Sequence, residues 1–148
     1  RAVGSNEAMV SLTVAETCLG GSNLGGNDNA VYDRTVAETG TTYTVDVQQV
    51  RLDRVFPLAL EIKLLKIDVE GFEAAVLRGS EDIIRRFKPV LFIELNDDNL
   101  RENGDSARSL ITHVELLGYR VLDGSTEEEI KKDHDLAHCQ FDILCVPL

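Results

Sequence analysis

Three acidic side chains follow apolar segments at positions where they could act on one ligand. Asp68 and Glu70 end the segment that begins at Leu64, and Glu94 ends the segment 90–93. If both segments are strands of one parallel sheet, their carboxyl ends meet at one edge, where open α/β sheets bind ligands. Close carboxylates raise one another's pKa, which predicts either a general base or a metal site.

The same acids also have a purely structural interpretation, which the pattern alone favours. Acidic residues are common at solvated strand ends and at helix starts, where they stabilise the helix dipole. Lys66 lies two positions before Asp68, so the pleat of a strand directs both side chains to one face. Because a lysine in a buried strand needs a partner, Lys66 forms either a structural ion pair or a contact with substrate.

The elements that would position these groups follow from the apolar periodicity. Segment 64–69 is nearly continuous in apolar residues, which is typical of a strand covered on both faces of a parallel sheet. Helical spacing begins at Phe72, and a break at Gly79 makes Ser80 the expected N-cap of a second helix. Pro89 ends that helix, and the buried strand 90–93 follows.

A second helix–strand unit comes next. We expect a polar loop over 96–104 and then a helix capped by Asp105 or Ser106. Its apolar stripe consists of Leu110, Ile111, Val114 and Leu117. Strands at 119–122 and 141–146 complete the alternation of strands and helices. This order indicates an α/β layer fold with right-handed crossovers.

The first third of the chain has a different pattern. Alternation of apolar and polar residues over 9–14 and again over 43–47 predicts two strands that pair with each other. Between them, residues 20–29 contain four glycines and three asparagines, which predicts a loop without regular structure. We therefore expect one domain, with a β-rich segment over 1–56 and an αβ core over 57–148.

Charge and composition exclude several classes of protein. The 148 residues include 15 Lys and Arg against 26 Asp and Glu, a net charge of −11, which excludes a basic nucleic-acid binder. No apolar stretch reaches the ~20 residues that cross a bilayer. We expect a cytoplasmic protein without nucleic-acid or membrane partners. Cys18, Cys139 and Cys145 are scattered and odd in number, so we expect reduced thiols, the last two as core residues.

A possible zinc site has too few ligands. His134 and His138 are four residues apart, a spacing that binds zinc on a helix, and Cys139 follows. Such a site needs further fixed ligands, and the surrounding residues are polar. A solvated surface turn is the favoured interpretation, and we predict no metal site.

One octapeptide is more distinctive than any other motif in the chain: Lys-Ile-Asp-Val-Glu-Gly-Phe-Glu at 66–73. It continues as Val-Leu-Arg-Gly at 76–79 and Pro-Val-Leu-Phe-Ile-Glu at 89–94. Together these segments resemble the FkbM family of S-adenosylmethionine-dependent methyltransferases. Weaker similarity extends over almost the whole chain, at residues 2–4, 21–24, 50–53, 118–121 and 141–147.

The resemblance implies an incomplete Rossmann-like methyltransferase fold with a mostly parallel sheet. It further implies methyl transfer from S-adenosylmethionine to a hydroxyl oxygen of a small molecule such as a sugar or polyketide. By family position, Ala2, Val3 and Ser5 would bind the donor, and Ser22 and Asn23 the acceptor.

The resemblance begins near the end of the family's third strand. The family's Gly-rich turn and acidic residue, which hold the methionine and ribose of the donor, have no counterpart in these residues. We therefore expect residues 1–148 alone to bind the donor weakly and to be inactive. An open sheet edge would also favour self-association.

The expected catalytic roles follow from the positions of the acids. We expect Asp68 to accept the hydroxyl proton, with Glu94 as the second choice, Glu70 as an orienting partner and Lys66 as an orienting or substrate-contacting group. Two alternatives remain open. One is a non-catalytic α/β binding module in which the acids are structural, and the other is metal-assisted phosphoryl chemistry with the same carboxylates.

Overall fold

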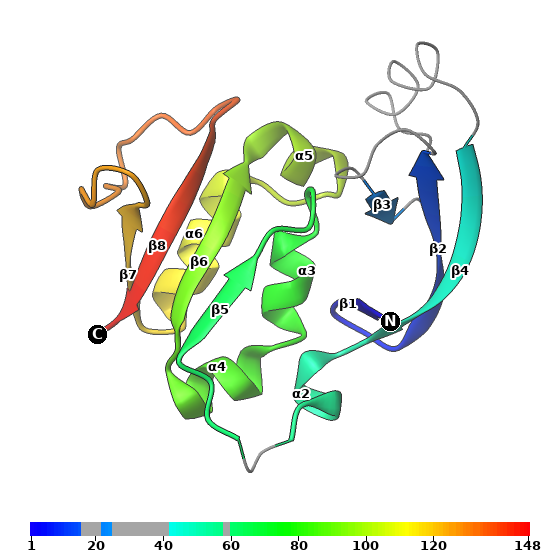
Figure 1. Ribbon diagram of the computed structural model, residues 1–148. Helices are drawn as coiled ribbons and strands as arrows, with labels where there is room; N and C mark the ends of the chain where they lie inside the picture. Colours follow the sequence, from blue (N-terminus) through cyan, green and yellow to red (C-terminus); the bar gives the residue numbers. More distant parts are fainter. Residues whose placement is uncertain (16–21, 25–41, 58–59) are drawn as a thin grey trace.

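The computed structural model describes residues 1–15, 22–24, 42–57 and 60–148, and within them the strands form two sheets (Figure 1). The first sheet has the order β1 (Ala2–Val3), β4 (Thr42–Val50), β2 (Ala8–Ala15) and β3 (Ser22–Leu24). The second has the order β5 (Leu64–Ile67), β6 (Val90–Asn96), β8 (Gln140–Pro147) and β7 (Tyr119–Asp123). The described helices are α2 (Leu52–Val55), α3 (Glu73–Arg78), α4 (Glu81–Phe87), α5 (Asp97–Glu102) and α6 (Ala107–Leu116).

The first sheet confirms the predicted pairing of the two N-terminal strands. β2 and β4 are antiparallel, with Ala8 opposite Gln49 and Ala15 opposite Thr42, and β1 joins β4 in parallel. The prediction of an irregular loop over 20–29 is wrong at β3, which pairs with β2. Ladder hydrogen bonds to β2 satisfy the β3 backbone and outweigh the low strand propensity of its residues. The rest of that predicted loop lies outside the described residues.

The second sheet is mixed, so the prediction of a mostly parallel sheet is wrong. β5 and β6 are parallel, whereas β8 runs antiparallel to both β6 and β7. The sequence predicts that 141–146 is a strand, but it does not show that this strand enters between β6 and β7. The α/β class is confirmed, and the Rossmann-like architecture is only loosely matched.

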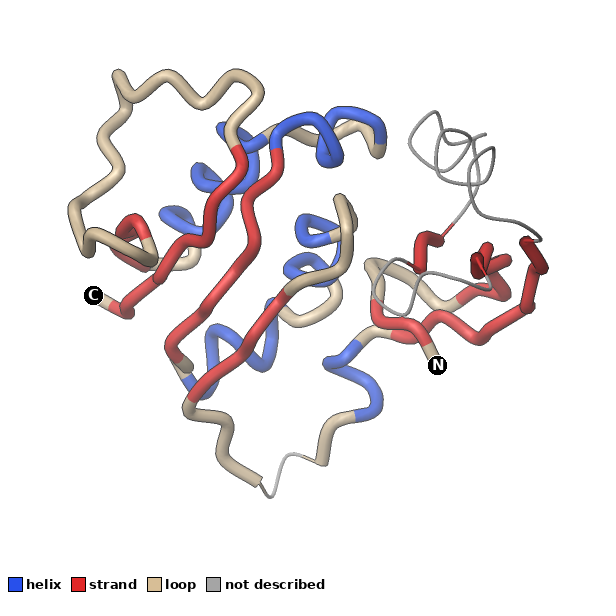
Figure 2. Tube along the Cα trace, turned by 45° about the horizontal axis from the view of Figure 1, so that its top comes forward, coloured by secondary structure: helices blue, strands red, loops and turns tan. Residues whose placement is uncertain are grey.

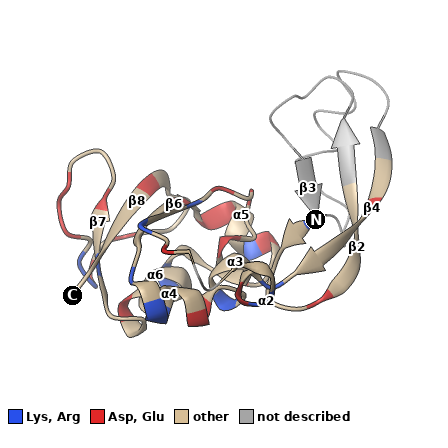
Figure 3. Ribbon diagram, turned by 60° about the horizontal axis from the view of Figure 1, so that its bottom comes forward, with Lys and Arg blue, Asp and Glu red and all other residues tan. Residues whose placement is uncertain are grey.

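Helices α3, α4 and α6 lie on one face of the second sheet (Figures 2 and 3). On that face Ile67, Ile93 and Ile143 are fully buried, whereas Leu64 on the other face is 61% exposed. The prediction that segment 64–69 is covered on both faces is therefore wrong. Two successive crossovers that advance in the same direction across a sheet place their helices on the same side.

The helix boundaries follow the predicted signals with two differences. α6 begins at a capping box formed by Ser106 and Ser109, and its predicted apolar stripe is buried. Ser80 precedes α4 as expected, but its hydroxyl donates to the carbonyl of Val76 and does not cap the helix. The predicted loop 96–104 contains α5, whose first turn is capped by the side chain of Asn96. Among the described helices, none is both long and apolar enough to cross a bilayer.

Asp97 connects three elements beside the sheet. Its buried carboxylate accepts hydrogen bonds from the amide of Ala107 at 2.8 Å, from Nε of Arg101 at 2.7 Å and from the amide of His138 at 3.3 Å. Burial alone would raise the pKa of Asp97, but these hydrogen bonds outweigh burial and lower it. Asp97 thereby fixes the starts of α6 and β8 against α5.

Asp97→Asn is expected to lower the free energy of unfolding by about 1–3 kcal/mol near neutral pH, because Asn offers one acceptor oxygen to three N–H groups. The folded-state pKa of Asp97 lies below its unfolded value, so its contribution is complete above the unfolded pKa and is lost as pH falls through the folded pKa. The difference between variant and wild type, measured by urea denaturation, should shrink in acid. A difference that is unchanged down to about pH 3 would contradict this role.

The segment after β1 meets the α3–α4 junction at a close backbone contact between Gly4 and Gly79. A Cβ on Gly79 would lie 2.0 Å from the carbonyl oxygen of Gly4. The carbonyl of Gly79 accepts from the amide of Asp53, whose buried carboxylate accepts from the amide of Ile83 and pairs with Arg51 at 3.0 Å. These bonds hold the end of β4 against the α3–α4 junction.

Candidate functional site

The structure brings the three predicted acids together at the carboxyl ends of β5 and β6. The parallel ladder pairs Ile67 with Ile93, so Asp68 and Glu94 follow at the same level of the sheet. Carboxylate oxygens of Asp68, Glu70 and Glu94 all lie within 4.8 Å of one another. Asp68 is exposed and the other two are half-buried. We call these three residues the acidic cluster.

A tight turn after β5 directs the side chain of Glu70 toward Asp68 and Glu94. Glu70 and Gly71 have φ angles of +50° and +94°, in the left-handed region that favours glycine. A Cβ at Gly71 would lie 2.5 Å from the backbone oxygen of Asn99 in α5, so the chain passes too close for any side chain. Asn99 also donates from Nδ2 to Oε2 of Glu70 at 3.2 Å. α5, predicted as loop, therefore orients a site residue.

Glu73 stabilises the same turn and is absent from the predicted site. Its Oε1 accepts from the amides of Val69 and Gly71, both at 3.1 Å. Its Oε2 is buried and has no partner among the described residues. Burial raises the pKa of Glu73, although the two amide hydrogen bonds oppose the shift. An acid at the start of a predicted helix, directly after a glycine turn, is the signal that could have identified it.

Glu73→Gln should become more stable relative to wild type as pH rises. The pKa of Glu73 is raised in the folded state, so wild type loses stability as pH increases from the unfolded pKa to the folded pKa. Gln does not titrate and keeps an oxygen for the amides of Val69 and Gly71. Chemical denaturation at about pH 5 and about pH 8 measures the effect. An equal difference at both pH values would mean that the carboxyl does not titrate with folding.

Glu94 has the electrostatic character that proton transfer requires. Its burial and the negative charges of Glu70 and Asp68 raise its pKa, with a further contribution from Glu73. Close carboxylates thus raise a neighbour's pKa here, as the sequence analysis expected. A carboxyl whose pKa moves toward neutrality is better matched to accept and return a proton.

Lys66 forms the ion pair that its spacing allowed. Its Nζ lies 2.7 Å from Oδ2 of Asp68, and both side chains are exposed. The hydrogen bond from Lys66 and the charge of Asp68 raise the pKa of Lys66. Since Lys66 is on the open face of β5, the premise that it is buried in the sheet is wrong. Its contact with substrate stays a prediction.

The residues expected to bind the donor lie in the first sheet. Ala2 and Val3 form β1, and α3 lies between β1 and β5 in two views (Figures 1 and 2). The carbonyl of Ser5 accepts from Nη1 of Arg51 at 3.0 Å. Within the described residues, no hydrogen bond or ion pair joins these residues to the acidic cluster, and their role toward the donor stays a prediction.

The residues expected to contact the acceptor are Ser22 and Asn23. Both belong to β3, where they pair with Val14 and Thr13 of β2. Their side chains lie outside what the structure describes, so their contact with substrate is likewise still a prediction.

The remaining histidine and cysteine predictions have mixed outcomes. Nδ1 of His138 lies 2.6 Å from Oδ1 of Asp98, and His134 lines a separate cavity. Cys145 is fully buried, and burial raises its pKa to about 12, so the prediction that it fills the core is confirmed. Cys139 is half-buried against the core, and Cys18 lies outside the described residues.

The acidic cluster can support two kinds of chemistry. Asp68 and Glu94 are positioned to take a proton from a bound hydroxyl, because both lie at the open edge of the sheet. Three carboxylates at this spacing are also a ligand set that a divalent cation accepts. Geometry alone does not separate these two uses.

Comparison with known proteins identifies the family. The model of the methyltransferase FkbM domain matches residues 2–121, which include the acidic cluster, the first sheet, β5, β6 and most of β7. No curated protein and no solved structure matches the chain. With 120 of its 148 residues covered by this model, the chain belongs to the FkbM methyltransferase family.

Proposed function

We propose that the protein transfers a methyl group from S-adenosylmethionine to a hydroxyl oxygen of a small molecule. The family supports methyl transfer in general. The observation that carries the finer proposal is the convergence of Asp68, Glu70 and Glu94 at one open edge of the sheet. A hydroxyl acceptor must lose a proton when it is methylated, and this edge offers carboxylates to take it.

The charge of the site fits the proposed donor. When bound, S-adenosylmethionine supplies an activated methyl group on a positively charged sulfonium. The acidic cluster places three carboxylates against the one ammonium of Lys66, and the charges of Glu70 and Asp68 add to the effect of burial on the pKa of Glu94. A cation placed near the cluster would relieve this repulsion. Ala2, Val3 and Ser5 are the residues of this chain that we propose to hold the donor.

The proposed roles differ among the acids. Asp68 is exposed and already paired with Lys66, a group that can hold its carboxylate in place. It accepts the hydroxyl proton in the proposed reaction. Glu70 is fixed by Asn99 and the turn, which suits an orienting hydrogen bond to the acceptor. Glu94 is the second candidate for the base because its pKa is raised.

Positioning must supply most of the acceleration. The donor's methyl group needs no activation by the protein, so the main task is to hold the acceptor oxygen in line with it. Asp68 directly precedes a backbone turn that contains Glu70 and is held by Glu73, Gly71 and Asn99. A rigid turn of this kind supports a role for these carboxylates in aligning the acceptor, and not only in attracting the charged donor.

The proposal is tested by binding and by transfer in the full-length protein. Calorimetry should give saturable binding of S-adenosylhomocysteine, and radiolabelled methyl from S-adenosylmethionine should appear in a panel of neutral hydroxylated small molecules. Magnesium chloride and a chromogenic phosphate ester form the comparison arm. Phosphate release without donor binding would contradict methyl transfer and favour metal-assisted phosphoryl chemistry. Absence of both would favour the non-catalytic binding module.

A further inference from the structure

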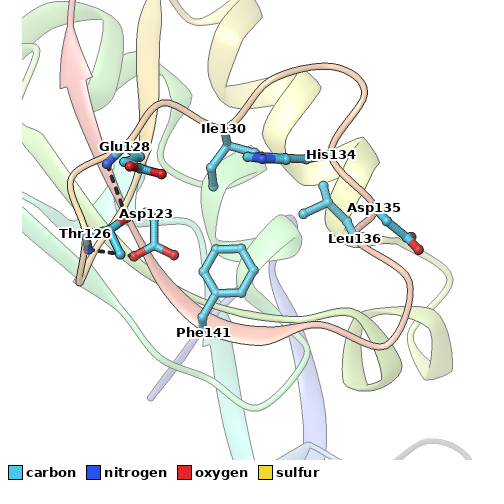
Figure 4. Close-up of a pocket in the computed structure, with 8 residues that line it drawn as sticks. All are labelled: Asp123, Thr126, Glu128, Ile130, His134, Asp135, Leu136 and Phe141. Atoms are coloured by element: carbon cyan, nitrogen blue, oxygen red, sulfur yellow. Dashed lines mark hydrogen bonds between the residues drawn. The ribbon is translucent and has the colours of Figure 1, made fainter.

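A separate cavity lies beneath the segment that joins β7 to β8 (Figure 4). Its volume is about 280 Å³, close to the ~300 Å³ at which small-molecule sites begin. Ile130, Leu136 and Phe141 form apolar walls, and the first two are buried in the hydrophobic core. We call this space the loop cavity.

Three of the five polar residues that line the loop cavity are acidic: Asp123, Glu128 and Asp135, beside Thr126 and His134. Asp123 and Glu128 point toward the space that Phe141 faces (Figure 4). All the lining residues belong to the described part of the chain, and none of them is Lys or Arg. Three carboxylates against one histidine therefore favour a cation over an anion in this cavity.

Asp123 is held in its ionised form at the cavity wall. Its Oδ1 accepts from the hydroxyl of Ser125 at 2.6 Å and from the amides of Ser125 and Thr126 at 2.8 and 2.9 Å. These hydrogen bonds, that from the Ser125 hydroxyl above all, lower the pKa of Asp123 to about 2. The other carboxylate oxygen points toward the Phe141 ring in Figure 4. A fixed anion thus lies beside an aromatic ring, an arrangement that suits an ammonium group on an apolar body.

We propose that the loop cavity binds a small organic ammonium ion, with its cationic group on Asp123 and its apolar part against Phe141, Leu136 and Ile130. Ile130, Leu136 and Phe141 supply no ligand atoms, so a bare metal ion would use only the carboxylate side of the cavity, whereas an organic cation would use both sides. The volume suits an aryl or short alkyl group. The charge of Asp123 therefore favours a cationic group, and the apolar walls favour an apolar group attached to it.

This site is distinct from the acidic cluster and does not rest on methyl transfer. Phe141 and Asp142 alternate along β8, and Asp142 lies opposite Glu94 in the ladder. Because alternate residues point to opposite faces, the loop cavity and the acidic cluster lie on opposite sides of the second sheet. A ligand in the loop cavity would approach the residues at the C-terminal ends of β6 and β7 from the helix side.

The proposal is tested on the unmodified chain with three probes of one shape. We expect 2-phenylethylammonium to bind saturably in an NMR titration and to shift resonances of Ile130, Leu136 and Phe141. The neutral 2-phenylethanol and the anionic phenylacetate should bind at least about tenfold more weakly at physiological salt. Equal binding of all three probes, or shifts confined to the acidic cluster, would overturn the proposal.

Substitution of Asp123 provides the second arm. Asp123→Asn keeps an oxygen for the Ser125 and Thr126 hydrogen bonds and removes the charge, so binding of 2-phenylethylammonium should weaken about tenfold. Asp82→Asn, an exposed position on α4, is the matched control and should leave the affinity unchanged. Equal effects of both variants would show attraction to net charge only. If Asp123→Asn fails to fold, the comparison of the three probes on the wild-type chain still tests the proposal.

Discussion

Asp68→Asn in the full-length protein should lower kcat for methyl transfer by about 10²–10⁴-fold, the range that a positioned general base contributes. The dissociation constant of S-adenosylhomocysteine should change little, because the substitution keeps the size of the side chain. The structural reason is the place of Asp68 within 4.8 Å of the other acids and 2.7 Å from Nζ of Lys66. Single-turnover rates with excess enzyme measure the effect on the chemical step.

Two further substitutions make this result interpretable. Glu94→Gln should lower kcat by a smaller factor, since Glu94 is the second candidate for the base. Glu61→Gln, at an exposed position before β5, is the matched control and should leave kcat unchanged. If Asp68→Asn and Glu94→Gln both retain wild-type turnover, the acidic cluster does not supply the base.

Gly79→Ala should destabilise the protein by about 1–3 kcal/mol, the usual cost of overpacking. Gly79 has φ −81°, a conformation that alanine adopts without strain. At such a position alanine ordinarily stabilises by about 0.4–1 kcal/mol, because it restricts the unfolded chain. Here the added Cβ would lie 2.0 Å from the carbonyl oxygen of Gly4, and both partners are backbone. The sign of the change therefore reports directly on the contact between Gly4 and the α3–α4 junction.

Gly104→Ala is the contrasting variant. A Cβ there meets nothing within 4 Å, and the cost comes only from its φ of +81°. Urea denaturation of both variants gives the free energy of unfolding, and the comparison separates the cost of the steric contact at Gly79 from the cost of a positive φ at Gly104. A stability gain for Gly79→Ala would show that the first sheet is not packed against the α3–α4 junction as described.

The convergence of the acids could be predicted because it depends on local regularities. Two apolar runs of similar length, each ending in an acid, give the same register once they pair in parallel, and the ladder places Ile67 opposite Ile93. The capping of α6 by Ser106 is equally local. In both cases the predictive pattern lies within a short segment: an acid that ends an apolar run, or a serine that precedes a helix.

The features that the sequence did not predict depend on contacts between residues that are far apart in the chain. Asn99 orients Glu70 only because Gly71 lets the turn approach α5, and the polar composition of 96–104 gave no sign of a helix. The entry of β8 between β6 and β7 is a property of the whole sheet, which periodicity does not encode. The second carboxylate oxygen of Glu73 is buried and has no partner in the described part of the chain, which a sequence pattern does not predict.

The most direct test is a crystal structure of the full-length protein with S-adenosylhomocysteine and a hydroxylated acceptor. The account predicts that the acceptor hydroxyl lies within hydrogen-bond reach of Asp68 or Glu94, roughly 2.6–3.2 Å, and about 3–3.5 Å from where the donor methyl would be. A donor sulfur bound on the helix-covered face of the second sheet, with the acidic cluster facing only solvent, would contradict it.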